Sequence, residues 1–311
     1  MIIQTGQRTD IPAFYSEWFA NRLKEGYVLV RNPYNPQSVT KYLLNPSVVD
    51  MIGFCSKNPA PMLKYMDLLK PYHQYWFVTI TPYGKDIEPN VPPVSSVLAS
   101  FRELAGVVGE SCMGWRYDPI IIDQDWTVER HTQCFESMAA ELAGFTHTAV
   151  ISFIDLYEKV KRNYPSARSV PLSTQLSLTE ALVRIGRKYD MVIKPCGEDK
   201  ILETVGADCS GCMTVRTFEE AIGCNLIVPP NPGNRKECSC YITGDIGAYN
   251  TCGHLCRYCY ANAEKETVLR NMKLHDPQSP MLIGNLEAGD TVHQAKQKSW
   301  IDYQMRLDLD Q

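Results

Sequence analysis

Residues 1–200 alternate short apolar runs with amphipathic segments, and this alternation limits the chain to few folds. Runs rich in valine, isoleucine, phenylalanine and tryptophan predict buried strands, and the segments between them have the apolar spacing of helices. Strands that alternate with helices form βα units, whose strands pair in parallel within one sheet. The predicted strands are YVLV (27–30), VVDMIGF (48–54), YWFVTI (75–80), SCMGW (111–115), TAVISFI (148–154) and YDMVI (189–193), with MIIQT (1–5) as a further candidate.

The number of these units predicts a TIM-like parallel βα barrel, complete or partial. A doubly wound open sheet is the alternative, but no G-x-G-x-x-G or phosphate-binding loop follows any predicted strand. A representative helix is predicted between Asp10, its expected N-cap, and Gly26, which ends it. We therefore expect a βα barrel over residues 1–200.

Residues 201–311 have a different composition, rich in Cys, Gly, Pro and Asn and with little periodicity. Such a segment is typical of a loop-dominated module held together by metal. We expect it to be a cysteine-rich, metal-binding segment followed by C-terminal helices. One helix is predicted at 261–273, and another begins near Asp290.

The N-terminus and the lengths of the apolar runs predict that the protein lies in the reducing cytoplasm. The N-terminus turns polar by Gln4, too early for a signal peptide, and no apolar run is long enough to span a membrane, so we expect a cytoplasmic protein. The net charge of −4 provides no global basic field and argues against nucleic acid as a partner. Twelve cysteines in such a compartment favour metal binding or redox chemistry over disulfides.

Three of the cysteines, Cys252, Cys256 and Cys259, lie in the stretch TCGHLCRYCY with C-x3-C-x2-C spacing. Three thiolates so placed can bind three irons of a [4Fe–4S] cluster and leave the fourth iron open to a substrate or cofactor. The alternative is zinc, with Cys238-x-Cys240 and Cys256-x2-Cys259 in one tetrahedral site.

The remaining cysteines predict a second metal site, which holds either a second iron–sulfur cluster or zinc. Its candidate ligands are Cys196, Cys209 or Cys212, Cys238 and Cys240.

Polar residues follow nearly every predicted strand, and barrel enzymes carry their chemistry at these carboxyl ends. Exposure to solvent is enough to explain one polar residue after a strand, but the recurrence of such residues after several strands favours an active site. The candidate catalytic residues are Lys57, Arg116, Asp118 and Lys194, and the candidate cofactor contacts are Asn58, Thr79, Thr81, Glu88 and Arg116.

Specific motifs run through the chain: RTDIPAFYSEWFANRLKEGYVLVRNPYN, KNPAP, TITPYGKDIEPNVPP, WRYDPIII, ISFIDLY and DIGAYNTCGHLCRYCYAN. On these motifs the chain resembles, over roughly residues 5 to 300, a bacterial family known as domain of unknown function 1848. Lys57-Asn58-Pro59, Glu88-Pro89 and WRYDP are distantly similar to radical S-adenosylmethionine enzymes of the spore photoproduct lyase type. TCGHLCRYCY resembles the cluster motif of those enzymes.

This resemblance implies a radical S-adenosylmethionine enzyme. In such an enzyme the cluster's open iron chelates S-adenosylmethionine, and a 5′-deoxyadenosyl radical abstracts hydrogen from a small-molecule substrate, here unknown. A reductase, flavodoxin or ferredoxin would supply the electron. Arg116 or Lys57 would bind the methionine carboxylate, and Asp118 or Glu88 the ribose hydroxyls.

The order of the motifs departs from that class, which places the cluster loop after the first strand. Here only 52 residues follow Cys259, so we expect the cysteine loop to fold back over the mouth of the preceding barrel. Two alternatives to a radical enzyme remain. One is a barrel enzyme with a structural zinc or iron–sulfur tail, in which Lys194 forms Schiff bases. The other is a non-catalytic iron–sulfur protein for electron transfer or redox sensing.

Overall fold

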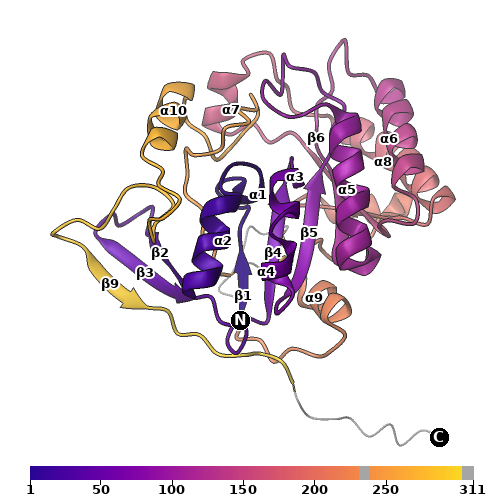
Figure 1. Ribbon diagram of the computed structural model, residues 1–311. Helices are drawn as coiled ribbons and strands as arrows, with labels where there is room; N and C mark the ends of the chain where they lie inside the picture. The colour runs from indigo at the N-terminus through magenta and orange to yellow at the C-terminus, as the bar shows by residue number, and fades with distance from the viewer. Residues whose placement is uncertain (231–237, 242, 303–311) are drawn as a thin grey trace, which may run out of the picture.

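A six-stranded parallel sheet forms the centre of the chain, in a computed structural model that describes residues 1–230, 238–241 and 243–302. Its strand order follows the order of the chain, so successive right-handed crossovers place the connecting helices on one face (Figure 1). The predicted parallel βα fold is therefore confirmed. The strands are β1 (Ile2–Gln4), β4 (Met51–Ser56), β5 (His73–Thr79), β6 (Met113–Ile120), β7 (Thr148–Phe153) and β8 (Val192–Pro195).

The sheet ends at β1 on one side and at β8 on the other. Within the described residues these two edges are not paired with each other, so the structure establishes an α/β sheet and not a closed barrel.

Helices cover the outer face of the sheet through large aromatic side chains. Phe54 of β4 and Trp76 of β5 stack with ring centroids 3.7 Å apart, and Trp115 of β6 stacks on Phe135 of α6 at 4.5 Å. The helices are α1 (Ile11–Phe14), α2 (Ser16–Glu25), α3 (Ala60–Leu63), α4 (Met66–Leu69), α5 (Val94–Val108), α6 (Val128–Leu142), α7 (Glu158–Asn163), α8 (Leu172–Lys188), α9 (Val215–Ile222) and α10 (Lys265–Lys273), with 3-10 turns at Glu110–Cys112 and Lys200–Val205.

The helix predicted between Asp10 and Gly26 is two helices. Asp10 caps α1 by accepting a hydrogen bond from the Ala13 amide (3.0 Å), and Gly26 ends α2 in the left-handed region at φ 78°. The break falls at Tyr15, whose φ of −132° lies outside the helical range. The Tyr15 hydroxyl donates to the carbonyl of Thr251 (2.6 Å), which ties this break to the cysteine-rich part of the chain.

A second, three-stranded sheet corrects two predictions. β2 (Tyr27–Arg31) was expected in the parallel sheet, but it pairs with β3 (Ser38–Leu43) as an antiparallel hairpin. β9 (Thr291–Gln294) replaces the helix predicted near Asp290 and pairs in parallel with β3. The side chains of β9 are all exposed, so a helix there would bury no apolar face, whereas pairing with β3 satisfies its backbone groups.

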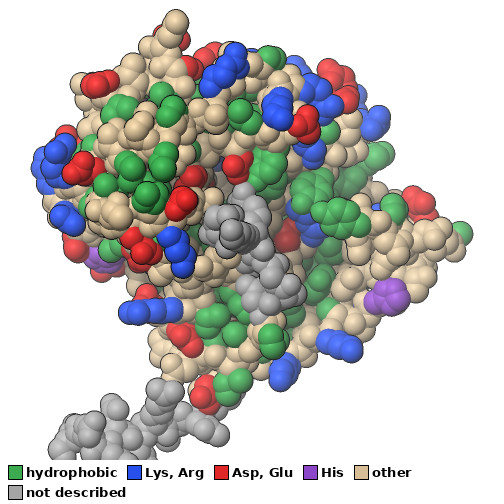
Figure 2. Space-filling view, turned by 180° about the vertical axis from the view of Figure 1, so that it is seen from behind, with side chains coloured by type: hydrophobic (Ala, Val, Ile, Leu, Met, Phe, Trp, Pro, Cys, Tyr) green, Lys and Arg blue, Asp and Glu red, His purple; other side chains and the backbone are tan. Residues whose placement is uncertain are grey.

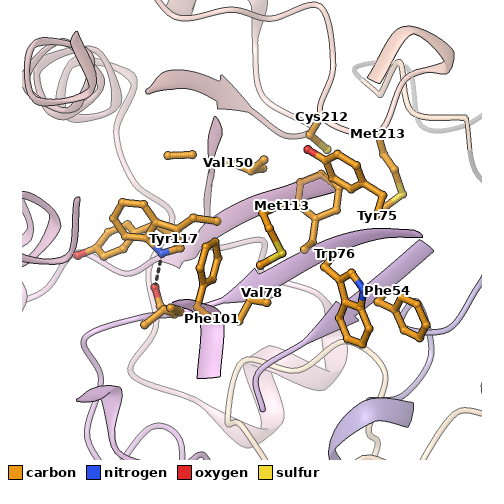
Figure 3. Packing of buried hydrophobic residues seen from close by; sticks show 14 of the residues in the cluster. Phe54, Tyr75, Trp76, Val78, Phe101, Met113, Tyr117, Val150, Cys212 and Met213 are labelled. Atoms are coloured by element: carbon orange, nitrogen blue, oxygen red, sulfur yellow. Dashed lines mark hydrogen bonds between the residues drawn. The ribbon is translucent and has the colours of Figure 1, made fainter. Parts of the chain in front are cut away.

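The cysteine-rich segment packs on the inner face of the sheet, opposite the helices. Tyr75 lies on this face, and Figure 3 shows Cys212 and Met213 beside its ring, with Trp76 and Phe54 on the other side. Phe218 of α9 contacts Tyr75 edge-on, at 6.4 Å between ring centroids. Residues before and after position 200 thus share one hydrophobic core.

The surface carries mixed charge. Figure 2 shows Lys and Arg side chains interspersed with Asp and Glu on the face that it views, in keeping with a net charge of −4. Among the helices described, none combines the length and apolar character needed to cross a membrane.

Candidate metal centre

A cavity of about 490 Å³ lies at the carboxyl ends of the parallel strands. This volume is within the range of small-molecule and cofactor sites, about 300–1,000 Å³. Each of the six strands contributes lining residues from the last part of the strand or from the segment that follows it, for example Asp10, Lys57, Thr79, Asp118, Asp155 and Cys196.

The cysteine loop, residues 251–260, forms one wall of this cavity. Cys252, Cys256 and Cys259 all line it, together with Tyr258. The loop therefore folds back onto the strand ends, as expected from its late position in the sequence.

Buried polar contacts hold the cysteine loop against the first strands. His254 Nε2 lies 2.8 Å from Asp10 Oδ2, both side chains are buried, and the His254 ring packs edge-on against Phe14. Asp10 also accepts hydrogen bonds from Ser56 Oγ (2.7 Å) and from the Lys57 amide (2.8 Å). One carboxylate thus joins the ends of β1 and β4 to the cysteine loop.

A second buried carboxylate, Glu88, holds the other end of the loop. Its Oε1 accepts hydrogen bonds from Tyr258 Oη, from Thr81 Oγ1 (2.6 Å) and from Lys57 Nζ (2.9 Å). Burial, the largest single influence, lowers the pKa of Lys57, but the charge and hydrogen bond of Glu88 together with other nearby acidic groups outweigh it and raise the pKa overall. Lys57 is therefore a fixed cation beside Cys256.

Hydrogen bonds to the backbone of the cysteine loop also hold it in place. Asn90 donates through its side chain to the Gly253 carbonyl (2.8 Å) and through its amide to the His254 carbonyl (3.2 Å). Leu255 has a φ of 57°, a left-handed conformation that costs energy for a branched residue and persists only where surrounding contacts fix it. These contacts order a loop that contains little regular structure.

The three loop sulfurs do not form a compact group. Within the described residues, Cys196, Cys212 and Cys240 are the set of three potential ligands whose ligand atoms all lie within 4.8 Å of one another. The sulfurs of Cys252, Cys256 and Cys259 do not meet that condition, so they are more widely spaced than the ligands of one small ion. Burial raises the pKa of all three thiols, so metal binding there would release protons.

The four-cysteine group, Cys196, Cys212, Cys238 and Cys240, lines the same cavity. Cys212 Sγ lies 3.4 Å from Cys196 Sγ and 3.3 Å from Cys240 Sγ, and these three sulfurs form the compact group. Cys238 lies outside the compact group but lines the same cavity, two residues before Cys240. Of the two alternatives at this site, the structure selects Cys212 over Cys209. The zinc site that would combine Cys240 with Cys256 does not occur as a compact group among the described residues.

Other predicted residues divide between the cavity wall and its surroundings. Arg116 and Asp118 line the cavity and pair through two nitrogens of the guanidinium, while Arg116 Nη1 points at Cys212 Sγ at 3.7 Å. Lys57 and Thr79 also line it.

Four predicted residues are not among those that line the cavity. Thr81 and Glu88 lie behind the wall in the contacts described above, and the Asn58 amide donates to Ser56 Oγ (2.9 Å). Lys194 pairs with Asp208 at 3.3 Å, which gives its ammonium a counter-ion away from the cavity.

Sequence reasoning missed the structural roles of Asp10 and Asn90. Asp10 had one adequate local explanation, as a helix cap, which concealed its contacts with a residue 244 positions later. A signal was present in the sequence: an acidic residue follows the candidate strand at 1–5 in the same way as other polar residues follow theirs.

Comparison with known proteins gives a family but no function. Residues 2–261 match the family described as Domain of unknown function (DUF1848), which is well over half of the chain. No curated protein matches the chain.

Proposed function

This chain belongs to the DUF1848 family, and from that premise and the geometry of the cavity we propose that it is a radical S-adenosylmethionine enzyme that abstracts hydrogen from a small-molecule substrate. The proposal rests chiefly on one observation. Three cysteines of a C-x3-C-x2-C loop line a cavity to which the ends of all six parallel strands contribute.

The donor set fits an iron–sulfur cluster better than a single ion. Soft thiolates are the usual ligands of such clusters, and each binds a different iron atom, which requires widely spaced sulfurs. Cys252, Cys256 and Cys259 are buried or half-buried, spaced beyond the limit for one small ion, and face a cavity of cofactor size. With S-adenosylmethionine, such a cluster supplies one-electron cleavage of the sulfonium and hence a radical that removes a hydrogen atom.

The residues of the chain would bind and orient S-adenosylmethionine and the substrate, while the cluster would carry out the electron transfer. Lys57 is a charged lysine on the wall next to the cysteine loop, which suits it to a carboxylate such as that of methionine. Asp118 offers carboxylate oxygens to hydroxyl groups, and its ion pair with Arg116 fixes its position. The walls formed by residues 152–155, at and just beyond the end of β7, and by the cysteine loop would exclude water from the reacting atoms.

The test is anaerobic purification, reconstitution with iron and sulfide, and assay for 5′-deoxyadenosine after reduction with S-adenosylmethionine present. We expect bound iron and sulfide and release of 5′-deoxyadenosine in the wild type, and loss of both in Cys252→Ala. Cys224→Ala is the matched control, because Cys224 follows α9, is half-buried and is not among the cavity-lining residues.

Two results would contradict the proposal. Iron and sulfide without cleavage of S-adenosylmethionine would favour an electron-transfer or redox-sensing protein. Protein without iron in which a carbonyl compound is trapped on Lys194 by borohydride would favour acid–base or Schiff-base chemistry.

A further inference from the structure

The four-cysteine group lies where the two free edges of the parallel sheet approach each other. Cys196 directly follows β8, and the Asp208 amide donates to the carbonyl of Ile193 in β8 (2.9 Å). Cys212 follows from this stretch, so two of the four thiols belong to the β8 side.

The other two thiols belong to the β1 side. The chain runs from Cys240 to the edge of β1, where the Gln4 amide donates to the Gly244 carbonyl (3.1 Å) and the Ile246 amide donates to the Gln4 carbonyl (2.9 Å). Among the described residues, a backbone bond from the Tyr241 amide to the Met213 carbonyl (2.7 Å) connects the two sides. The sulfurs of Cys196, Cys212 and Cys240 thus meet where a closed barrel would have further strands, and Cys238 lines the cavity beside them.

The separations between these sulfurs are close to those between the ligands of one tetrahedral ion. Zinc–sulfur bonds of about 2.3 Å place tetrahedral ligands roughly 3.8 Å apart. Two of the separations here are 3.3 and 3.4 Å, and the sulfurs of Cys196, Cys212 and Cys240 all lie within 4.8 Å. The thiolates of a [4Fe–4S] cluster sit on separate iron atoms and so stand farther apart.

A disulfide explains this arrangement less well, because a disulfide uses two sulfurs and three converge here, with a fourth cysteine on the same cavity wall. The described cysteines form no disulfide. The described parts of their loops also contain little regular structure apart from α9, yet they cover the inner face of the sheet at Tyr75. Loops of this kind gain their stability from metal binding, since the ion replaces the hydrogen-bonded strands that they lack.

We propose that Cys196, Cys212, Cys238 and Cys240 bind one Zn²⁺ in a closed tetrathiolate site that joins the β8 and β1 edges of the open sheet. The four thiolates outweigh the charge of the ion, and the guanidinium of Arg116, 3.7 Å from Cys212 Sγ, offsets part of the excess negative charge. This site is structural, and the inference does not depend on the proposed radical chemistry.

The experiment separates the two metals. In a variant with Cys252, Cys256 and Cys259 all changed to Ala, metal and sulfide analysis is expected to find one zinc per chain, with iron and sulfide lost. After chelation and loading with Co²⁺, this variant is expected to show the absorption bands of a tetrahedral cobalt thiolate at one Co²⁺ per chain.

Cys212→Ser in the same background is expected to lose the zinc. Cys209→Ser, three residues earlier in the same loop, is expected to keep it, because Cys209 is outside the compact group and, unlike Cys238, is not among the cavity-lining residues. If Cys212→Ser does not fold, the cobalt spectrum of the unaltered four-cysteine group still decides the question.

Three results would overturn the inference. Iron and sulfide retained in the triple-alanine variant would indicate a second cluster. A single bound iron in place of zinc would contradict the choice of metal, and a disulfide among the four cysteines with no bound metal would contradict metal binding. Failure of the proposed function gives a different result, namely zinc at one per chain in a wild type that binds no iron.

Discussion

The hydrogen bond from Tyr258 to Glu88 joins the cysteine loop to the segment between β5 and α5, and Tyr258→Phe removes this bond while keeping the ring. Glu88 is 2% exposed, and its Oε1 keeps two other donors, Thr81 Oγ1 at 2.6 Å and Lys57 Nζ at 2.9 Å. A hydrogen bond to a charged group contributes about 1.5–3 kcal/mol, and the two remaining donors place this loss near the lower end. A loss of about 1.5 kcal/mol corresponds to roughly tenfold more frequent opening of the loop.

Hydrogen exchange measured by mass spectrometry on the metal-free protein tests this value, because it reports local opening segment by segment. We expect amides of residues 251–260 to exchange roughly tenfold faster in Tyr258→Phe. Reconstituted Tyr258→Phe should also lose iron to a chelator faster than the wild type.

Tyr72→Phe is the matched control. The buried Tyr72 hydroxyl donates to the Leu44 carbonyl at 2.8 Å, and neither residue lines the cavity. This change should lower the free energy of unfolding by about 1 kcal/mol and leave exchange in the cysteine loop unchanged. Unchanged exchange in Tyr258→Phe, or equal acceleration in both variants, would refute the reasoning that Glu88 holds the loop.

Three further predictions concern stability, measured by urea unfolding. Asp10→Ala leaves His254 and other buried donors without an acceptor, so the free energy of unfolding should fall by at least about 2 kcal/mol; no change would mean that the contact contributes nothing. Trp115→Ala should cost about 3–5 kcal/mol, against less than about 0.5 for the exposed Val107→Ala, and equal losses would contradict the core packing. Burial lowers the pKa of His131, so the unfolded chain binds the extra proton first; stability should fall as the pH drops through about 6.5, and His131→Gln should flatten this dependence.

Local patterns in the sequence were sufficient for the main sheet and most of its helices. An apolar run such as residues 75–80 predicts a buried strand from neighbouring residues alone. The helix caps at Asp10 and Gly26 likewise depend on contacts within one turn of the chain. The hairpin partner of β2 and the strand β9 were missed, because strands whose side chains are largely half-buried or exposed have no strong apolar periodicity.

Cysteine spacing identified the sulfur-rich segments but not how they combine. The C-x3-C-x2-C loop reads as one unit because its members are neighbours in the chain, whereas the choice of Cys212 over Cys209 depends on where β8 and α9 direct the intervening loop. Sequence separation carries no information about such distances.

The sequence by itself determined the parallel βα units and the three-cysteine loop, since both depend on interactions between residues close along the chain. Only the tertiary structure decided that Asp10 and Glu88 hold that loop at the strand ends, and that the sulfurs of Cys196, Cys212 and Cys240 meet between β8 and β1. These contacts join residues up to 244 positions apart, and packing of the whole sheet brings them together.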